Sequence, residues 1–406
     1  MVGFETITVE DATEAIIDYR GKTPPKTASG VQLITAKVIK GGRILEEPKE
    51  FIAADFYDEW MRRGLPQRLD VLITTEAPLG EVAILRDRER IALAQRVILL
   101  RARRGRVDPV FLFYALQSEF GQSELHARAT GTTVAGIKQS ELRQARLPVF
   151  ELPVQCRIAG ILSAYDELME NCQRRIRISE DMARALYREW FVCFRFPGHA
   201  NAPLVDSPLG PIPQGWSFRA IRDFGSVVTG KTPSKANPEF YGEGVPFVKT
   251  PDMHGNMFVL ATSDGLSSAG AQSQSNKTIP AGSICVSCIG TIGVVCLTTE
   301  DCQTNQQINS VVLNDDDARE FLFLRLQDAK QAFENLGASG ATMGNVNKGK
   351  FEAVEFLTPT KDLLRSYHRL AAPMFAQILA LSRKIQNLRR TRDLLLPRLL
   401  SGQAAP

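Results

Sequence analysis

Two nearly identical loops in this chain carry side chains that could contact phosphate. The first reads RGKTPPK and ends at Lys26, and the second reads TGKTPSK and ends at Lys235. Lysine and hydroxyl side chains are common phosphate partners, and such contacts position a protein on nucleic acid. The alternative is a structural turn, in which proline fixes φ and glycine supplies flexibility. The candidate phosphate contacts are Lys22, Thr23, Lys26, Lys231, Thr232, Ser234 and Lys235.

The second loop also meets the motif G-x-x-x-x-G-K-[ST] of a nucleotide-binding phosphate loop, with Gly225 as its first glycine. The first loop has Ile16 at that position and does not meet the motif. In both copies a proline follows the threonine, which disfavours a helix there, whereas a phosphate loop holds its ligand at a helix N-terminus. An ATPase that uses Gly225 to Thr232 is therefore kept only as a weak alternative.

A second pair of loops combines small hydroxyl side chains with a glycine. ATGTT begins at Ala129, and ASGAT begins at Ala338. Glycine permits the backbone to approach a ligand closely, and in the major groove asparagine can pair with adenine and lysine with guanine. A tight turn before the next strand is the alternative. The candidate DNA contacts in and after these loops are Thr132, Thr133, Lys138, Thr342, Asn345, Asn347 and Lys348.

A polar amide cluster lies at Asn305, Gln306 and Gln307. Side-chain amides both donate and accept hydrogen bonds, so this cluster could read the edges of bases. The alternative is a loop whose amides satisfy its own backbone. We retain Asn305 and Gln306 as candidate DNA contacts.

The other residue types give little support for metal binding or catalysis. Cys285 and Cys288 have the spacing of half a zinc site, but a structural site needs a second ligand pair with similar spacing, and Cys296 and Cys302 are too far apart. The four histidines are scattered, and no motif of a hydrolase, metalloprotease or Rossmann enzyme stands out. We expect no metal, no cofactor and no catalytic site in this chain, while an enzyme with an unrecognised site stays open.

Length and composition are typical of a soluble protein with several domains. The chain has 406 residues, of which 44% are apolar and 23% are charged, and this size predicts two or three domains. No apolar run reaches the roughly 18 residues of a membrane span, and no signal peptide is evident, so we expect a cytoplasmic protein without membrane contact. The net charge of +4 is compatible with nucleic acid, and a basic run from Arg86 to Arg106 could contact phosphate or form a solvated rim.

The loops belong to an internal repeat. Gly21 and Gly230 are 209 residues apart, and so are Ala129 and Ala338. Between these anchors, two apolar runs with a glycine-containing turn have the pattern of a β-hairpin, DVLITTEAPLGEV in the first half and GSICVSCIGTIGVV in the second. The chain is therefore predicted to contain one globular fold twice.

Each copy ends in a long helical pattern with one apolar stripe. Apolar and small residues alternate in steps of four and three from Ile158 to Trp190, and again in the same register from Tyr367 to Leu399. Roughly 40 residues of helix extend about 60 Å and need a partner for the stripe, which the other copy can provide. The expected boundaries are 1–152 for the first domain, 153–195 for its helix, 196–216 for a linker rich in Pro and Gly, 217–360 for the second domain and 361–402 for its helix.

Antiparallel pairing of these helices would give the molecule an internal pseudo-twofold axis. Such an object suits duplex DNA that is read at two separated half-sites, because the protein geometry sets the spacing of half-sites in two-headed readers. A protein-binding adaptor on the same duplicated frame is the leading alternative.

Four sets of residues together span both halves: TGKTPSKANPEFYGEGVPFVKTPDM, SCIGTIG with TNQQINS, ATGTTVAGIKQSELRQARLPV and LRRTRDLLLPRLLSGQ. With these stretches the chain resembles the specificity (S) subunit of type I restriction-modification systems. Their order and duplication are specific, although no single motif is. The first copy departs from the family pattern, because VQLITAKVIKGG stands where the second copy has YGEGVPFVKTPDMHGN.

The resemblance implies an α+β fold with two similar α/β target-recognition domains. Two long helices, paired as an antiparallel coiled coil with an internal pseudo-twofold repeat, would separate these domains. Each domain would read one half of a bipartite sequence in double-stranded DNA. The helices would act as a spacer and dock two methyltransferase (M) subunits that use S-adenosylmethionine, and restriction (R) subunits could be added outside. The specificity subunit itself would not be catalytic.

Overall fold

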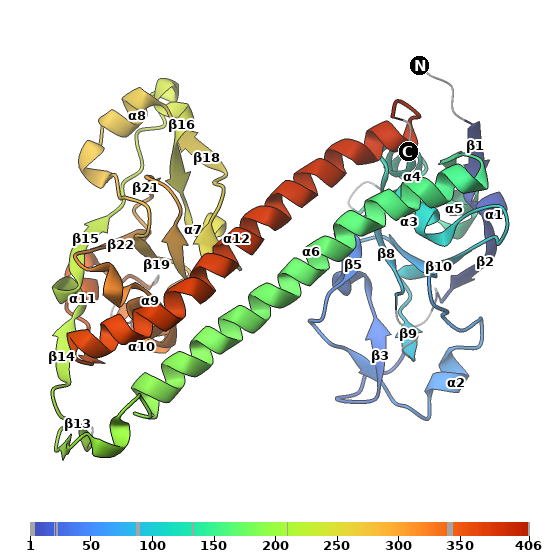
Figure 1. The fold of residues 1–406 in the computed structure, drawn as a ribbon. Helices are drawn as coiled ribbons and strands as arrows, with labels where there is room; N and C mark the ends of the chain where they lie inside the picture. The colour runs from blue at the N-terminus through green and yellow to red at the C-terminus, as the bar shows by residue number, and fades with distance from the viewer. Residues whose placement is uncertain are drawn as a thin grey trace. The chain divides into compact units, whose positions relative to one another are not determined.

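The chain forms two compact units, seen here in a computed structural model (Figure 1). The structure describes residues 5–19, 21, 23–86, 90–131, 134–208, 210–338 and 344–404. The first unit consists of Met1–Glu170 with Gln386–Pro406, and the second consists of Asn171–Ile385. Helix and sheet occur in both units, as the sequence predicts. Within the described part of the chain, no helix is both long enough and apolar enough to cross a bilayer.

The first unit is built on a four-stranded antiparallel sheet, in the order β2-β10-β7-β8. Its strands are β2 (Thr13–Asp18), β10 (Val97–Ala102), β7 (Val71–Thr75) and β8 (Leu79–Ile84). A smaller sheet consists of β6 (Phe51–Ile52), β3 (Val31–Ile34) and β9 (Ile91–Leu93), with β3 parallel to β9. Two strand pairs complete it: β1 (Glu5–Thr8) with β11 (Arg146–Val149), and β4 (Ile39–Lys40) with β5 (Arg43–Ile44). Its short helices are α1 (Val9–Ala12), α2 (Tyr57–Trp60), α3 (Pro109–Gln117), α4 (Glu119–Ala127) and α5 (Gln139–Gln144).

The second unit has a five-stranded sheet in the order β15-β22-β19-β20-β17. Its strands are β15 (Gly225–Thr229), β22 (Ile308–Leu313), β19 (Ile284–Ser287), β20 (Val295–Thr298) and β17 (Phe258–Val259). A smaller sheet consists of β18 (Asp264–Leu266), β16 (Tyr241–Val248) and β21 (Gln303–Thr304), with β16 parallel to β21. Two strand pairs complete it: β14 (Ser217–Ala220) with β23 (Glu355–Thr358), and β12 (Leu204–Val205) with β13 (Ile212–Pro213). Its short helices are α7 (Thr250–Met253), α8 (Ser268–Gln272), α9 (Arg319–Asp328), α10 (Lys330–Ala338) and α11 (Lys348–Glu352).

The two units repeat one topology. The order β2-β10-β7-β8 in the first unit corresponds to β15-β22-β19-β20 in the second, and each of these pairings is antiparallel. The parallel pair β3–β9 corresponds to β16–β21, and the outer pair β1–β11 corresponds to β14–β23. Both apolar runs predicted as hairpins are hairpins, β7–β8 and β19–β20. The duplication seen in the sequence is therefore a duplication of the fold.

Both faces of the main sheet in the first unit are buried, because successive apolar side chains of a strand point alternately to two core clusters. On β7, Val71 and Ile73 belong to one apolar cluster, while Leu72 between them belongs to the cluster on the other face. Successive side chains of a strand point to opposite faces, so both faces need cover. The helix α3 supplies Phe111 and its neighbours on one face, which explains why the strand reads as a continuous apolar run.

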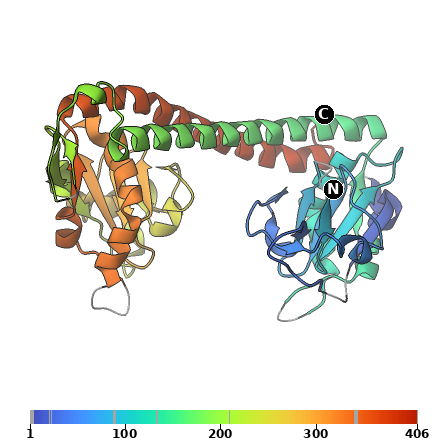
Figure 2. The same cartoon turned by 90° about the horizontal axis from the view of Figure 1, so that it is seen from below.

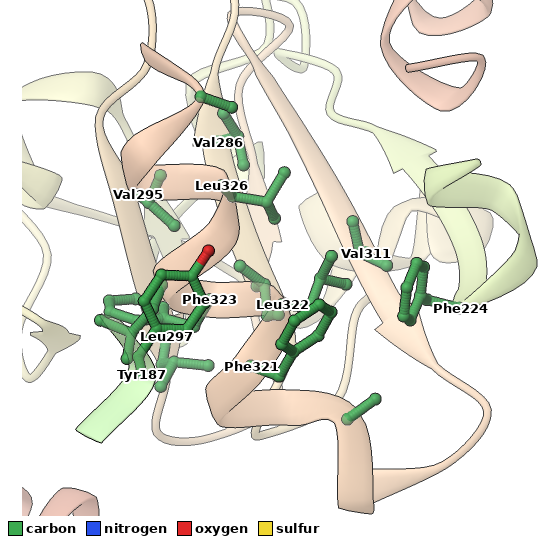
Figure 3. Packing of buried hydrophobic residues seen from close by; sticks show 14 of the residues in the cluster. Tyr187, Phe224, Val286, Val295, Leu297, Val311, Phe321, Leu322, Phe323 and Leu326 are labelled. Carbon is green, nitrogen blue, oxygen red and sulfur yellow. The ribbon is translucent and has the colours of Figure 1, made fainter. Parts of the chain in front are cut away.

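In the second unit, helix α9 packs on the main sheet in the corresponding place (Figure 3). Its residues Phe321, Leu322 and Leu326 lie in one cluster with Val286, Val295 and Val311 of the strands, and all are nearly inaccessible to solvent. Tyr187 of the long helix α6 joins this cluster, with its ring centroid 6.2 Å from that of Phe321. The core thus links the sheet to the long helix.

The two long helices contribute residues to both units. Helix α6 spans Leu152–Tyr187 and continues as a π-helical turn over Arg188–Val192, and α12 spans Lys361–Leu400. In the second unit, the ring of Tyr367 lies 5.7 Å from that of Trp190, and Ser179 donates a hydrogen bond to Gln377 at 3.3 Å. There the α12 segment (red) runs beside the α6 segment (green) in both views (Figure 2). In the first unit, Ile158 and Leu399 share a core cluster.

The segment 196–216, expected to be a linker, packs on the second unit. Phe196, Ile212 and Trp216 are buried in its core, and Leu204 and Val205 pair with Ile212 and Pro213 to form a short hairpin. Its prolines and glycines set turns in a folded segment. The segment is therefore not an open tether.

A polar cluster interrupts the apolar helix contact in the first unit. Arg392 of α12 donates a hydrogen bond to the buried carboxylate of Asp166 at 2.6 Å, and the hydroxyl of Tyr114 donates to the same carboxylate at 2.5 Å. Burial, together with the nearby carboxylate, raises the pKa of Tyr114 far above its ordinary value, so the phenol stays protonated and acts as a donor. In the repeat, Asp166 corresponds to Phe375 and Arg392 corresponds to Ala183. The second unit therefore has apolar residues at the positions of this ion pair.

Arg392→Ala is expected to destabilise the protein strongly, by about 3 kcal/mol, because it leaves the Asp166 carboxylate buried without its cation. The exposed Arg390 on the same helix provides a matched control, and Arg390→Ala is expected to change stability by less than about 0.5 kcal/mol. Urea unfolding followed by circular dichroism measures both. Equal midpoints for the two variants would contradict this account of the cluster.

Candidate nucleic-acid interface

The second proline loop lies directly against the amide cluster. The loop follows β15, and the backbone N–H of Lys231 donates to the carbonyl of Thr304 at 2.9 Å. The hydroxyl of Thr232 donates to the side-chain oxygen of Gln306. A side chain at Gly230 would meet the carbonyl oxygen of Asn305 at 2.2 Å. The glycine is therefore required because two protein segments approach closely.

This geometry excludes the phosphate-loop alternative. Gly225 begins strand β15 and pairs with Leu313, and a side chain at Gly225 would meet the carbonyl of Val312 at 2.0 Å. A phosphate loop needs a strand, a glycine-rich turn and then a helix N-terminus. Here the motif glycines lie in a paired strand and in a crowded turn. The next helical segment is only a 3₁₀ turn over Pro238–Phe240.

The turn that follows β19 joins the amide cluster to the last predicted loop. The backbone N–H of Cys288 donates to the carbonyl of Gln307 at 2.7 Å, and the carbonyl of Cys288 accepts from Val346 at 2.9 Å. Ile289 forms an isolated bridge with Asn345. The proline loop, the amide cluster and the segment around Asn345 therefore meet at one edge of the second unit.

The first unit brings its corresponding segments together with the same hydrogen bonds. The backbone N–H of Thr75 donates to the carbonyl of Arg96 at 3.0 Å, and the carbonyl of Thr75 accepts from Ile137 at 3.0 Å. Glu76 forms a bridge with Gly136, as Ile289 does with Asn345. A hollow of about 340 Å³ at this edge is lined by residues that include Gly21, Glu76, Gln95, Thr130 and Lys138.

Most of the predicted contact residues that the structure describes are exposed. Gln306 is exposed, whereas Asn305 is only 8% exposed, and its side chain hydrogen-bonds to the side chain and the backbone of Gln307. Thr232 is half-buried. The exposed members are Thr23, Lys26, Lys138, Lys231, Ser234, Lys235, Gln306, Asn345, Asn347 and Lys348. Lys22, Thr132, Thr133 and Thr342 lie outside the described residues.

Several of these side chains also have structural roles that the sequence reasoning did not foresee. Asn347 is the N-cap of α11, where its side-chain oxygen accepts from the backbone N–H of Lys350 at 2.9 Å. Lys26 pairs with Glu50 at 2.7 Å, and Lys348 lies 3.9 Å from Glu352 on the next helical turn. Lys231 is exposed and its hydrogen bonds described here involve only its backbone, so its side chain remains a better candidate for contact with a ligand.

Lys235 also lines a larger hollow of about 910 Å³ beside β16 and β18. Its wall contains the glycine-rich segment YGEGVP, and the hydroxyl of Tyr241 donates to the carbonyl of Pro233 at 2.7 Å. The hydrogen bond ties this wall to the proline loop. The surface around the loop therefore continues into an open groove of the second unit.

Several arginines of the basic run in the first unit pair with acidic neighbours. Arg101 pairs with the buried Asp70 at 2.8 Å, and Arg90 pairs with Asp58 at 3.2 Å. Arg96 pairs with Glu76 at 2.7 Å, and this pair lies at the same edge as the predicted loops. The sequence reasoning missed it because Arg96 was counted as one more member of the basic run. The sequence could have revealed this position, because Arg96 aligns in the repeat with Gln307 of the amide cluster.

Four cysteines of the second unit are buried in or beside strands β19, β20 and β21, namely Cys285, Cys288, Cys296 and Cys302. Cys285 on β19 lies opposite Cys296 on β20, and burial raises the pKa of Cys288 to about 11. The Cys288 thiol is therefore protonated near neutral pH and packs as a small hydrophobic side chain. Across the described ranges, no three His, Cys, Asp or Glu side chains are grouped so that they could hold a metal ion.

Comparison with known proteins places the fold and the loops in a family. The family model described as the type I restriction modification DNA specificity domain matches residues 2–180 and 213–362, which is more than half of the chain. The chain is 44% identical over 194 residues to the type I restriction enzyme HindI specificity subunit of Haemophilus influenzae, an alignment that covers 47% of this chain and 42% of the relative. It thus spans less than half the length of that relative.

Two further comparisons extend over most of the chain. The type I restriction enzyme MjaIX specificity subunit of Methanocaldococcus jannaschii is 24% identical over 82% of this chain and 77% of its own length. The crystal structure of a type I restriction-modification system S subunit from M. genitalium has the same fold, with a TM-score of 0.66 and 14% identity over 98% of this chain and 96% of that one. Because the family model matches both halves, the chain belongs to the family of type I restriction-modification specificity subunits.

Proposed function

We propose that this chain reads a bipartite DNA sequence for a type I restriction-modification complex, with one half-site bound by each unit. The observation that carries the proposal is the repeated edge. In both units the same backbone hydrogen bonds, at Thr75 and at Cys288, bring the turn before β10 or β22 together with the segment that contains Ile137 or Val346. The side chains at this place differ, with Glu76 and Arg96 in one unit and Ile289 and Gln307 in the other. Two DNA-binding units with the same fold but different side chains at this edge suit two different half-sites.

We further propose that α6 and α12 pair as an antiparallel coiled coil that sets the spacing of the half-sites. Antiparallel pairing is supported within each unit: Asp166 bonds to Arg392 in the first, while Ser179 bonds to Gln377 in the second. The sums of the paired residue numbers stay close to one value, as antiparallel helices require. A pseudo-twofold axis is supported by the contact of Ile158 with the cluster of Leu399, which corresponds to the contact of Tyr367 with Trp190.

The partners follow from the same scheme. Two methyltransferase subunits, one for each half of the pseudo-twofold, would dock on the long helices and supply the catalytic site and S-adenosylmethionine. A restriction subunit could be added outside them. This chain would have no catalysis of its own and would act in the cytoplasm. A protein-binding adaptor, in contrast, would have no sequence preference on DNA.

The test is to co-express the chain with its cognate methyltransferase subunit and to map the methylated bases of the host genome. The proposal predicts methylation within one asymmetric bipartite sequence. The purified complex should also lose affinity for DNA steeply as salt rises, since phosphate contacts release counterions, and should keep its preference for that sequence. Methylation without a bipartite sequence would contradict the proposal.

Lys231→Ala is expected to weaken DNA binding about equally for all sequences, because we assign this exposed lysine a phosphate contact. The slope of log affinity against log salt should fall by about 1. Lys361→Ala removes an exposed lysine at the start of α12 and serves as the matched control, for which no change in slope is expected. ATP hydrolysis by the wild-type chain that Lys231→Ala abolishes would instead revive the ATPase alternative.

Leu381→Glu is expected to disrupt the helix pair and the assembly with methyltransferase subunits together. Leu381 is 6% exposed and lies in the core cluster that includes residues of both long helices, so a carboxylate there is buried without a partner. Leu394→Glu makes the same change at a position that is 57% exposed and should leave folding intact. Gel filtration and thermal unfolding distinguish these outcomes. Unchanged assembly of Leu381→Glu would count against the helix pair.

A further inference from the structure

We infer that Arg96, held in place by Glu76, reads a guanine in the first half-site, and that the second unit lacks this contact. The inference rests on the proposed function, since it names which side chain distinguishes one half-site from the other. It concerns the edge of the first unit, where the turn before β10 meets the turn after β7.

The backbone of Arg96 is fixed at this edge. Its carbonyl accepts from the backbone N–H of Thr75 at 3.0 Å, and the hydroxyl of Thr75 lies 3.4 Å from the same carbonyl oxygen. Val97 then enters the central strand β10 and is fully buried. The Cα of Arg96 is therefore held by the sheet, so only its side chain has freedom. A base-reading group needs such a rigid support.

The side chain is oriented by one carboxylate. The Nε atom of Arg96 lies 2.7 Å from Oε1 of Glu76, and the two side chains are 49% and 42% exposed. Glu76 is positioned in turn by its bridge with Gly136, where an added Cβ would lie only 3.3 Å from the Cβ of Glu76. The glycine lets the turn that carries Glu76 pack closely on the segment around Gly136, which follows the ATGTT loop.

Stability does not account for this pair. Exposed ion pairs contribute about 0–1 kcal/mol, whereas Arg101 in the same run pairs with a carboxylate that is 2% exposed and has a structural role. The pair is also a poor phosphate contact, because the carboxylate cancels the charge of the guanidinium. What it offers is a planar fork of donors beside one carboxylate, with Nε as the nitrogen nearest to Glu76.

A guanine edge matches this arrangement. In the major groove, guanine presents the acceptors O6 and N7, and a guanidinium contacts both at once through two N–H groups. The Nη groups of Arg96 can make this contact while Nε stays on Glu76. Lysine can also contact guanine, but its ammonium is a point charge without the planar geometry of the fork, so it should discriminate less. We therefore assign Arg96 as the residue that reads the base and Glu76 as a positioning residue.

The second unit has a different group at the matching position. Gln307 replaces Arg96, and its side-chain oxygen accepts from Asn305 at 3.0 Å and from Thr250 at 3.4 Å. Ile289 replaces Glu76, so no carboxylate orients a cation there. The exposed amide at this edge is that of the neighbouring Gln306. The two half-sites should therefore differ at the base pair that faces this position.

The test measures binding of the full chain with its methyltransferase subunits to duplexes in which each base pair of the wild-type target is varied in turn. Arg96→Ala should lower affinity for the wild-type duplex about 10-fold or more and abolish the preference for guanine at one position of one half-site. Arg96→Lys keeps the charge and should relax the same position. Glu76→Gln should relax it to a smaller extent. The other half-site should be unchanged in every case.

Arg62→Ala is the matched control, because Arg62 is an exposed arginine of the same unit with an ion pair to Glu59 at 3.5 Å. It should change neither affinity nor preference. A loss with Arg96→Ala that is equal for all duplexes would identify a phosphate contact and overturn the inference, as would an unchanged preference with Arg96→Lys in a folded protein. If the wild-type complex itself shows no sequence preference, the proposed function fails and the inference fails with it.

Discussion

Burial of the apolar stripe on each long helix is the constraint on which the rest of the structure depends. A helix of 36 or 40 residues with one apolar face is not stable alone in water, and most helical stability in proteins comes from packing. Here each stripe is divided between two cores: Ile158 and Leu399 lie in the core of the first unit, while Ile176 and Ile378 lie in the core of the second. Neither unit is complete without segments of both helices, so a change in the stripe affects the whole chain.

The two long helices have their apolar stripes in the same register, but the polar side chains that contact the helices differ between the two units. In the first unit the helices meet through Tyr114, Asp166 and Arg392, where the second unit has apolar residues. In the second unit His368 lies 2.6 Å from the buried Glu320, whose pKa is raised by burial, and the matching residues of the first unit are Val110 and Ala159. A buried charge without its partner is costly. These clusters therefore favour the association of each helix segment with its own unit. An arrangement in which the corresponding segments of the two units were exchanged would leave these charges without partners.

The repeated fold could be predicted from the sequence because the spacing of 209 residues recurs at both pairs of loops and along the two helices. Both predicted hairpins follow from apolar runs with glycine turns. The convergence of the loops could be predicted only in outline. Sequence spacing does not reveal which backbone N–H pairs with which carbonyl, so the Thr75 and Cys288 contacts were not foreseen. Nor does residue type separate a ligand contact from a cap or an ion pair, as Asn347 and Lys26 show. Arg96 was missed because its partner Glu76 is 20 residues away in the chain.

The central claim is that one DNA reader is present twice, with a pseudo-twofold relation between the copies. The most direct measurement replaces residues 5–149 with residues 217–358, co-expresses this chimaera with the methyltransferase subunits and maps methylated bases. Each segment begins and ends with a strand of the outer pair, β1–β11 in one unit and β14–β23 in the other, so the exchange ends where the topologies coincide. The account predicts methylation of a sequence that contains the second half-site twice, in inverted orientation. Retention of the original first half-site, or two copies in the same orientation, would contradict it.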